Sequence, residues 1–420
     1  MTTRPALDQF DVSTASAVDN TAVNPDTSAV RIASIDIFRG LTVLVMIFVN
    51  DLSSVHGLPW WTYHALANQD AMTYVDMVFP FFLFIVGMSM PLAINRRLEK
   101  NPSKASLWLH VLSRSAGLVV LGLILANAEE ADPVRMGLNS NVWALLGLAG
   151  AVLFWFAPSR GLRGSRVFRW LRVAGLVLLM LTFALFRRSA GHGTGVWIDG
   201  SYPEILGLIG YTYLAASILY IPTRGWLWSP LAWMVALTAF CAVLIEHHVR
   251  LRVPLYFWPF GSGALPSIIM AGVVTSFIFL GPHRWQSLAQ RMQLAFGFAA
   301  AMFVSGWLLT PLGISKIRAT PTWCLYSSGA AVLCFALLYW VCDVKGKTAW
   351  ARLVRPAGEN TLLTYLLPDF YFFLTTLAGF TLIDQHFSSG ALGVARAAVF
   401  TLVMLGFSAL LTRSHIRLQL

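Results

Sequence analysis

The sequence predicts an all-α fold, a polytopic membrane helix bundle of about 11–12 transmembrane helices. Of its 420 residues, 57% are hydrophobic and only 12% are charged, whereas soluble domains have about 25% charged residues. One span needs about 20 apolar residues, so this content supplies about a dozen spans. No loop exceeds about 25 residues, and an inserted soluble domain is therefore not expected.

Twelve apolar runs of span length follow one another along the chain, separated by polar or charged segments. We expect each to form a helix, because a backbone inside lipid must satisfy its own hydrogen bonds. An even number of spans places both chain ends on one side of the membrane. The runs cover roughly 35–52, 73–94, 106–127, 140–157, 170–187, 203–221, 228–246, 263–281, 292–313, 321–342, 361–380 and 393–412.

Basic residues are distributed unevenly between the two sides of this bundle. Twenty of the thirty Lys and Arg residues lie on the side of the termini, seven lie on the opposite side and three lie within spans. Cytoplasmic loops carry an excess of positive charge, so both termini are predicted to be cytoplasmic. The net charge of +11 is then explained by orientation and by contact with anionic membrane lipid, and no nucleic-acid partner is expected.

The N-terminal segment differs in composition from the rest of the chain. Residues 1–30 are rich in Ser, Thr, Asp, Asn and Ala, and they lack the apolar core of a signal peptide. This composition predicts a disordered cytoplasmic tail, followed by one transmembrane domain over 31–420.

The four cysteines give no sign of a metal site. They lie in or beside apolar runs, with no C-x-x-C pair and no histidine at ligand spacing. We interpret them as thiols of the core, and no metal is predicted. They are Cys241, Cys324, Cys334 and Cys342.

The first span contains two ionisable residues, and such groups are costly inside a bilayer. Asp36 and Arg39 are three residues apart, so they can pair with each other or with another helix. In a functional alternative, the guanidinium of Arg39 would meet a ligand phosphate. Arg96 and Arg97, after the second span, add clustered positive charge on the predicted cytoplasmic side.

A polar loop joins the first two spans and contains most of the candidate chemistry. Thr73 and Asp76 form a capping-box pattern ahead of the second span, although a carboxylate there could also orient a histidine. His64 is the best catalytic candidate, because a neutral imidazole can accept a proton or attack a thioester. Asn50 could donate to a developing oxyanion, or it could simply cap the first helix.

Other polar residues have plainer explanations. Glu204 and Asp369 lie near span ends, where an interfacial position is the first interpretation. His247 and His248, beside Arg250 and Arg252, form a basic outer patch that we interpret as a solvated loop.

The first two spans and their loop resemble the heparan-alpha-glucosaminide N-acetyltransferase family of transmembrane acyltransferases. The family pattern is S-x-D-x-F-R-G, then M-x-x-V-N, then H-A, then T-x-x-D-x-V-F-P and a glycine. Here it is matched in order by Ser34-Ile-Asp36-Ile-Phe38-Arg39-Gly40, Met46-Ile-Phe-Val49-Asn50, His64-Ala65 and Thr73-Tyr-Val-Asp76-Met-Val-Phe79-Pro80 through Gly87. Weaker similarity continues to about residue 380.

The resemblance implies acyl transfer across a membrane, with acetyl-CoA as cytoplasmic co-substrate, no bound cofactor and an amino sugar or other glycan group as acceptor. The catalytic histidine of the family maps onto His64 and its active-site asparagine onto Asn50. Asp76 is then expected to be the partner of His64. The phosphates of CoA would meet Arg39 first, with Asp36, Arg96 and Arg97 nearby.

The chain departs from the family pattern at two places. Residues 66–72 include apparent extra residues after His64-Ala65, and Asp51 follows Asn50 where an aromatic or small residue is usual. These departures lie near the expected acceptor pocket, so they affect the identity of the acceptor more than the type of reaction. His56 is a rival to His64 in the same loop.

Two alternatives to this family assignment stay open. A secondary transporter or flippase could use Asp36, Arg39 and Asp76 to bind ions or a sugar-lipid. The unrelated acyltransferase-3 family would O-acylate a polysaccharide, but its motifs differ from S-I-D-I-F-R-G. We expect a multi-pass protein of a bacterial inner membrane; its oligomeric state is open, a homodimer included.

Overall fold

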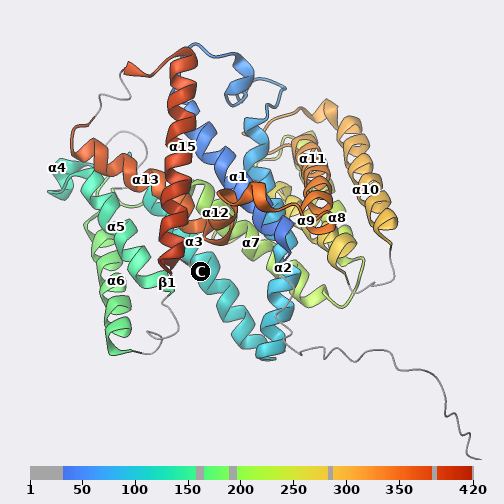
Figure 1. The fold of residues 1–420 in the computed structure, drawn as a ribbon, viewed down its shortest axis with the longest axis horizontal. Coiled ribbons are helices and arrows are strands. Elements are labelled where there is room, and N and C mark those ends of the chain that lie inside the picture. The colour runs from blue at the N-terminus through green and yellow to red at the C-terminus, as the bar shows by residue number, and fades with distance from the viewer. Residues whose placement is uncertain (1–31, 158–164, 189–195, 282–286, 381–385, 419–420) are drawn as a thin grey trace, which may run out of the picture. The chain divides into compact units, whose positions relative to one another are not determined.

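The computed structural model describes residues 32–157, 165–188, 196–281, 287–380 and 386–418. The chain divides into Met1–Ile32 and Ala33–Leu420, and the fold given below belongs to the second unit (Figure 1). The tail predicted for residues 1–30 lies outside the described residues.

A helix coincides with each predicted span, so the all-α membrane bundle is confirmed. Within the described ranges, eight helices are long and apolar enough to cross a membrane, and α5, α9 and α13 are apolar but shorter. The helices at the predicted spans are α1 Ala33–Leu52, α2 Val78–Lys100, α3 Lys104–Ala128, α5 Ser140–Trp155, α6 Arg166–Leu185, α7 Glu204–Thr223, α8 Ser229–Glu246, α9 Ala264–Leu280, α10 Leu288–Leu308, α11 Pro321–Tyr339, α13 Thr361–Leu377 and α15 Gly390–Arg413.

Short elements connect these helices. The strands β1 Phe156–Ala157 and β2 Arg417–Leu418 pair antiparallel, with Phe156 opposite Leu418. The short helices are η1 Trp60–Thr62, η2 Val75–Met77, α4 Pro133–Met136, η4 Thr310–Leu312, the π-helical turn η5 Trp340–Val344, η6 Ala349–Ala351 and α12 Val354–Glu359.

Several helices begin at side chains that satisfy their first backbone N–H groups. Ser287 and Gln290 form a reciprocal capping box at the start of α10. Thr320 caps α11, and Pro321 occupies its first turn, where no backbone N–H is needed. The Thr320 cap ends the connection between α10 and α11, and this connection reaches the site described below.

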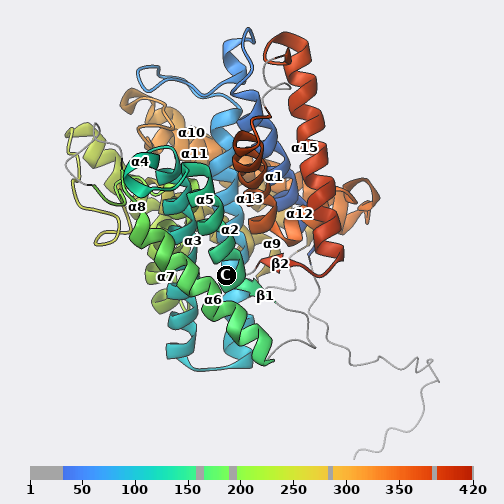
Figure 2. The ribbon, with the colours of Figure 1, turned by 90° about the vertical axis from the view of Figure 1, so that its left-hand side faces the viewer.

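Close backbone contacts hold neighbouring helices together. A side-chain carbon added at Gly87 of α2 would overlap the backbone of Ile269 in α9, and one added at Gly272 would overlap that of Phe84. Small residues let helices approach closely in lipid, where the hydrophobic effect does not drive helices together. Figures 1 and 2 show α5 beside α6 and α10 beside α11, pairs that also pack closely.

Apolar side chains cover the outside of the bundle as well as its interior. On α6, Trp170 is 71% exposed and Met180 is 67% exposed. Apolar surface this extensive is unfavourable in water and suits contact with lipid tails. Inside, the rings of Phe38, Phe279 and Phe335 join α1, α9 and α11.

The two described ends of the chain lie at the same end of the bundle. At the start of α1, the backbone N–H groups of Ala33 and Ser34 donate to Asp343, which follows α11. Near the other end of the chain, the N–H of Leu418 donates to Asn360, which precedes α13. Both acceptors belong to the connection between α11 and α13, as an even number of spans requires.

The interpretation of the cysteines as core thiols is wrong at one position. Cys241, Cys324 and Cys342 are buried, but Cys334 is exposed. Cys334 lines an apolar groove between α1, α2 and α11 together with Phe38 and Phe81. Hydropathy does not separate a lipid-facing thiol from a buried one, because both lie in apolar runs.

Candidate active site

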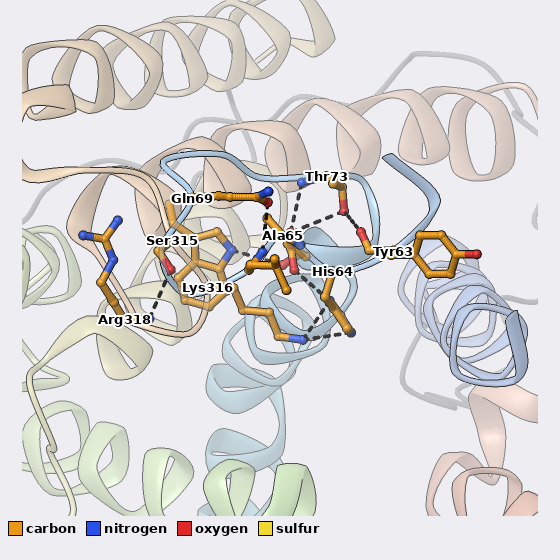
Figure 3. Close-up of polar contacts among 11 residues, drawn as sticks. Tyr63, His64, Ala65, Gln69, Thr73, Ser315, Lys316 and Arg318 are labelled. Carbon is orange, nitrogen blue, oxygen red and sulfur yellow. Dashed lines mark hydrogen bonds and ion pairs between the residues drawn. The ribbon is translucent and has the colours of Figure 1, made fainter. Parts of the chain in front are cut away.

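The loop between α1 and α2 is held in shape by its own hydrogen bonds. The hydroxyl of Tyr63 donates to the carbonyl of Val55 at 2.6 Å. The hydroxyl of Thr73 donates to the carbonyl of Tyr63 at 2.9 Å. These bonds close the segment into a compact turn over the bundle, so the intervening His64 projects from a braced backbone (Figure 3).

His64 and Asp76 form the central contact of this loop. The Nδ1 atom of His64 lies 2.7 Å from Oδ1 of Asp76, and the Asp76 side chain is fully buried while that of His64 is 42% exposed. A carboxylate accepts, so the contact places the ring proton on Nδ1 and leaves the lone pair on Nε2. The expected partnership of these two residues is therefore present in the structure.

The second oxygen of Asp76 is fully used by the loop. Oδ2 accepts from the backbone N–H groups of Thr73 at 3.0 Å and Ala65 at 3.2 Å, and from the Thr73 hydroxyl at 3.3 Å. The capping-box prediction is thus half right. Asp76 bonds back to Thr73, but the Thr73 hydroxyl donates to Asp76 and Tyr63 instead of accepting from the helix.

Lys316, from the connection between α10 and α11, lies against the His64 ring (Figure 3). Its Nζ is 3.4 Å from Nδ1 and 3.3 Å from Nε2. Burial lowers the pKa of the Lys316 ammonium below its usual value, and the Asp76 carboxylate partly offsets this. Sequence reasoning missed Lys316, since a single lysine in a loop carries no local signal.

Asn50 faces the same space from α1. Asn50, His64 and Lys316 line a narrow pocket of about 20 Å³ with apolar walls, which holds no more than about one water molecule. Within the described chain, the Asn50 side chain forms no hydrogen bond, so the alternative of a helix cap is wrong. Its amide is open to a ligand.

A larger cavity adjoins this pocket. Its volume is about 610 Å³, within the usual range of ligand sites. Asn50 and Tyr365 line both spaces. Glu204 and Asp369 line the larger one, and the Tyr365 hydroxyl donates to Glu204 at 2.8 Å. From the sequence we interpreted Glu204 and Asp369 as interfacial, and we did not predict that they line one cavity. Ionisable groups inside spans often mark functional sites, and this signal could have identified them.

Asp51 and His56 also line the larger cavity. Asp51 lies 3.3 Å from the guanidinium of Arg396, which also donates to the Ser54 hydroxyl at 2.5 Å. The unusual Asp51 thus ties the end of α1 to α15. His56 is held through its backbone to Ser388, and Asp76 contacts His64 and not this rival histidine.

The predicted donor-binding residues lie elsewhere in the bundle. Arg39 is 3.6 Å from Asp36 and donates to Ser89 at 2.6 Å and to the carbonyl of Gly358 at 3.3 Å. Arg96 and Arg97 lie at the far end of α2, about 30 Å along the helix from Asp76. Neither cavity beside Asn50 is lined by any of these four residues. Their role toward a donor stays a prediction.

The arrangement offers base and nucleophile chemistry. An imidazole oriented by a buried carboxylate can take a proton from an acceptor group, or attack a carbonyl carbon itself. Asn50 and Lys316 can donate to an oxygen in the same pocket. Over the residues that the structure describes, no cluster of three His, Cys, Asp or Glu side chains has the arrangement of a metal site.

Known proteins match this chain in the region of the site. Residues 31–248, just over half of the chain, match the family described as "Domain of unknown function (DUF5009)". Mouse heparan-alpha-glucosaminide N-acetyltransferase is 36% identical over 207 residues, 43% of this chain and 31% of the mouse protein. The human protein of that name is 36% identical over 97 residues, 23% of this chain and 14% of the human protein.

His64, Asn50, Asp76 and Glu204 lie inside the family match, whereas Lys316 and Asp369 lie outside it. The matched segments cover less than a third of each curated relative. The family match covers more than half of the chain and includes the first two spans and the loop that joins them. The chain belongs to the DUF5009 family and is related to heparan-alpha-glucosaminide N-acetyltransferase.

Proposed function

We propose that this protein is a transmembrane acetyltransferase. It takes an acetyl or similar acyl group from cytoplasmic acyl-CoA and transfers it to an amino or hydroxyl group of an envelope glycan. The observation that supports this most directly is the Asp76–His64 pair, because Asp76 binds Nδ1 and not Nε2, and His64 lines a pocket shared with Asn50. The name of the curated relatives, an N-acetyltransferase, agrees with this chemistry.

Two routes use these residues. In direct transfer, the acceptor nitrogen attacks the thioester carbon while Nε2 takes its proton; the C–S bond then breaks, and the proton passes to the departing sulfur. In the stepwise route, Nε2 attacks the thioester first and CoA leaves as a thiolate; the acceptor then displaces the acyl group from His64, and the proton of the acceptor passes to Nε2 as that atom is freed. In both routes Asp76 holds the ring in the required tautomer.

The cavity of about 610 Å³ is the proposed acceptor site. Asn50 lines both this cavity and the His64 pocket, so a group bound in the cavity can reach the ring. Glu204 and Asp369 on its wall offer carboxyl oxygens that can form hydrogen bonds with the amino and hydroxyl groups of a sugar acceptor.

The proposed orientation places the termini in the cytoplasm of a bacterium and His64 near the outer leaflet. The excess of Lys and Arg on the side of the termini supports this. Arg39, Asp36, Arg96 and Arg97 would then lie on the donor side. Arg39 is eleven residues before Asn50, about 16 Å along α1, a distance that the thioester arm must bridge.

Sealed membrane vesicles test reaction and orientation together. Inverted vesicles, with the cytoplasmic face outward, are loaded with glucosamine and given acetyl-CoA labelled in the acetyl group. We expect labelled N-acetylglucosamine inside and one CoA thiol released per acetyl transferred. Right-side-out vesicles given external acetyl-CoA should form none. His64→Ala should lower the rate by at least about 10³-fold.

The matched control is His247→Ala, which removes an exposed histidine from another loop and should keep the wild-type rate. His56→Ala tests the rival histidine and should retain kcat. A folded His64→Ala protein with the wild-type rate would remove the central assignment. Glucosamine movement without CoA release would instead support a transporter.

A further inference from the structure

Lys316 reaches the reacting ring from a segment far away in the sequence. The connection that carries it is braced without its help. The backbone N–H of Ser315 donates to the Thr320 hydroxyl at 3.0 Å, and the Trp323 indole donates to the carbonyl of Asp76 at 3.1 Å. Arg318, two residues on, contacts Asp70. The position of Lys316 therefore does not depend on its own ammonium.

The ammonium group is not required to neutralise Asp76. Oδ1 of Asp76 faces His64, and Oδ2 already accepts from Thr73 and Ala65. Lys316 also cannot donate to Nδ1, because that atom carries the proton given to Asp76. An ionic lock is thus a poor explanation for a half-buried cation at this place.

The geometry instead directs the ammonium toward the pocket. Nζ lies 3.3 Å from Nε2, and an ammonium has three N–H donors. At most one can face Nε2, and the others are available to an oxygen in the pocket that Lys316 shares with Asn50 and His64. A carbonyl carbon reacting at or beside Nε2 would place its oxygen within reach.

We propose that Lys316 is a catalytic residue that stabilises the oxyanion formed when the thioester carbonyl is attacked beside His64. This inference rests on the proposed function. In direct transfer, the acceptor nitrogen bonds to the carbonyl carbon and gives its proton to Nε2, while the π electrons move onto oxygen, where the ammonium pairs with them. As the C–S bond breaks, the electrons return and the sulfur leaves with the proton held by Nε2. Lys316 keeps all its protons throughout.

The vesicle assay with Lys316→Met and Lys316→Arg tests this role. We expect Lys316→Met to lower kcat by about 10²–10³-fold, the usual effect of losing one oxyanion donor, with little change in KM for acetyl-CoA. Lys316→Arg keeps the charge and should recover at least a tenth of the wild-type kcat. Arg252→Met, which removes an exposed cation from the connection between α8 and α9, is the matched control and should retain kcat.

The pH profile supplies a readout that a purely structural role would not move. The ammonium form is the active one, and His64 and Asp76 are the titratable groups that face it. Because burial lowers the pKa of Lys316, the wild-type rate should fall on the alkaline side below the usual lysine range. In Lys316→Arg this fall should move to higher pH, since arginine stays charged.

Three results separate the possibilities. An inactive wild-type protein would refute the proposed function itself. An active wild type with unchanged kcat in a folded Lys316→Met protein would overturn the role of Lys316 alone. A raised KM for acetyl-CoA with unchanged kcat would also overturn it, because the residue would then bind the donor equally in ground and transition states. Elution of each variant as a single species in size-exclusion chromatography establishes folding.

Discussion

The polar side chains at the two ends of α1 differ in whether their hydrogen bonds are made inside the protein. At its start, Asp36 and Arg39 face each other, and Arg39 also donates to Ser89 and to Gly358. At its end, the Asn50 amide and the Nε2 atom of His64 face a pocket. The start uses its polar groups to join α1, α2 and α12, whereas at the end only Asp51 is used in this way, toward Arg396, and the Asn50 amide lines a pocket.

Within one span, this difference distinguishes polar residues that join helices from polar residues that can act on a ligand. Buried polar groups are stable when their hydrogen bonds are made inside the protein. A site must instead hold its reacting atoms in place through other atoms, as Asp76 holds His64 through Nδ1 and not through Nε2. The residue types are similar at both ends, so the partners decide the role.

The largest expected effect comes from the carboxylate behind His64. Asp76→Asn should lower kcat on the order of 10³-fold, because an amide can present its N–H to Nδ1 and favour the wrong tautomer. The vesicle assay measures this. Asp36→Asn is the matched control at the other end of α1, and its kcat per folded molecule should stay near the wild type. Equal losses in the two variants would contradict the comparison.

The next effect concerns stability. Arg39→Met should lower the free energy of unfolding by about 1–3 kcal/mol, because it removes bonds between α1, α2 and α12 at a partly buried site. Thermal unfolding of the purified protein, followed by intrinsic fluorescence, should show a lower midpoint. An unchanged midpoint with a raised KM for acetyl-CoA would instead assign Arg39 to the donor.

The smallest effect belongs to the wall of the larger cavity. Asp51→Asn removes the negative charge that partly compensates Arg396. An ion pair of this kind is worth about 1 kcal/mol, which corresponds to about a 5-fold change in an equilibrium constant. We therefore expect KM for glucosamine to rise about 5-fold at unchanged kcat. Asp132→Asn, which keeps the cap of α4 but neutralises an exposed pair with Arg135, is the control. A similar change with a neutral acceptor would argue against an electrostatic cause.

The helices were predictable because a span is defined by local composition. Each run of apolar residues between polar segments became one helix, and the bounds shifted by a few residues where caps such as Ser287 lie outside the apolar run. The partnership of Asp76 with His64 was also accessible, since the two residues belong to one short loop and match a known pattern.

The remaining parts of the site depend on contacts between distant segments. Glu204 and Tyr365 meet across 161 residues, and Lys316 meets His64 across 252. No local pattern encodes such a meeting, because it depends on which helices pack together. The exposed position of Cys334 escaped prediction for a related reason, as lipid and protein core present the same apolar surroundings.

The sequence by itself determined that the chain forms membrane helices and that His64 is the first residue to examine, since hydropathy and short motifs depend on neighbours in the chain. Only the tertiary structure decided which polar residues share a cavity and which ones form bonds that join helices. It also decided that Lys316 lies against the His64 ring. The physical reason is that close helix packing in lipid is set by shape and small residues along whole helices, such as Gly87 against α9.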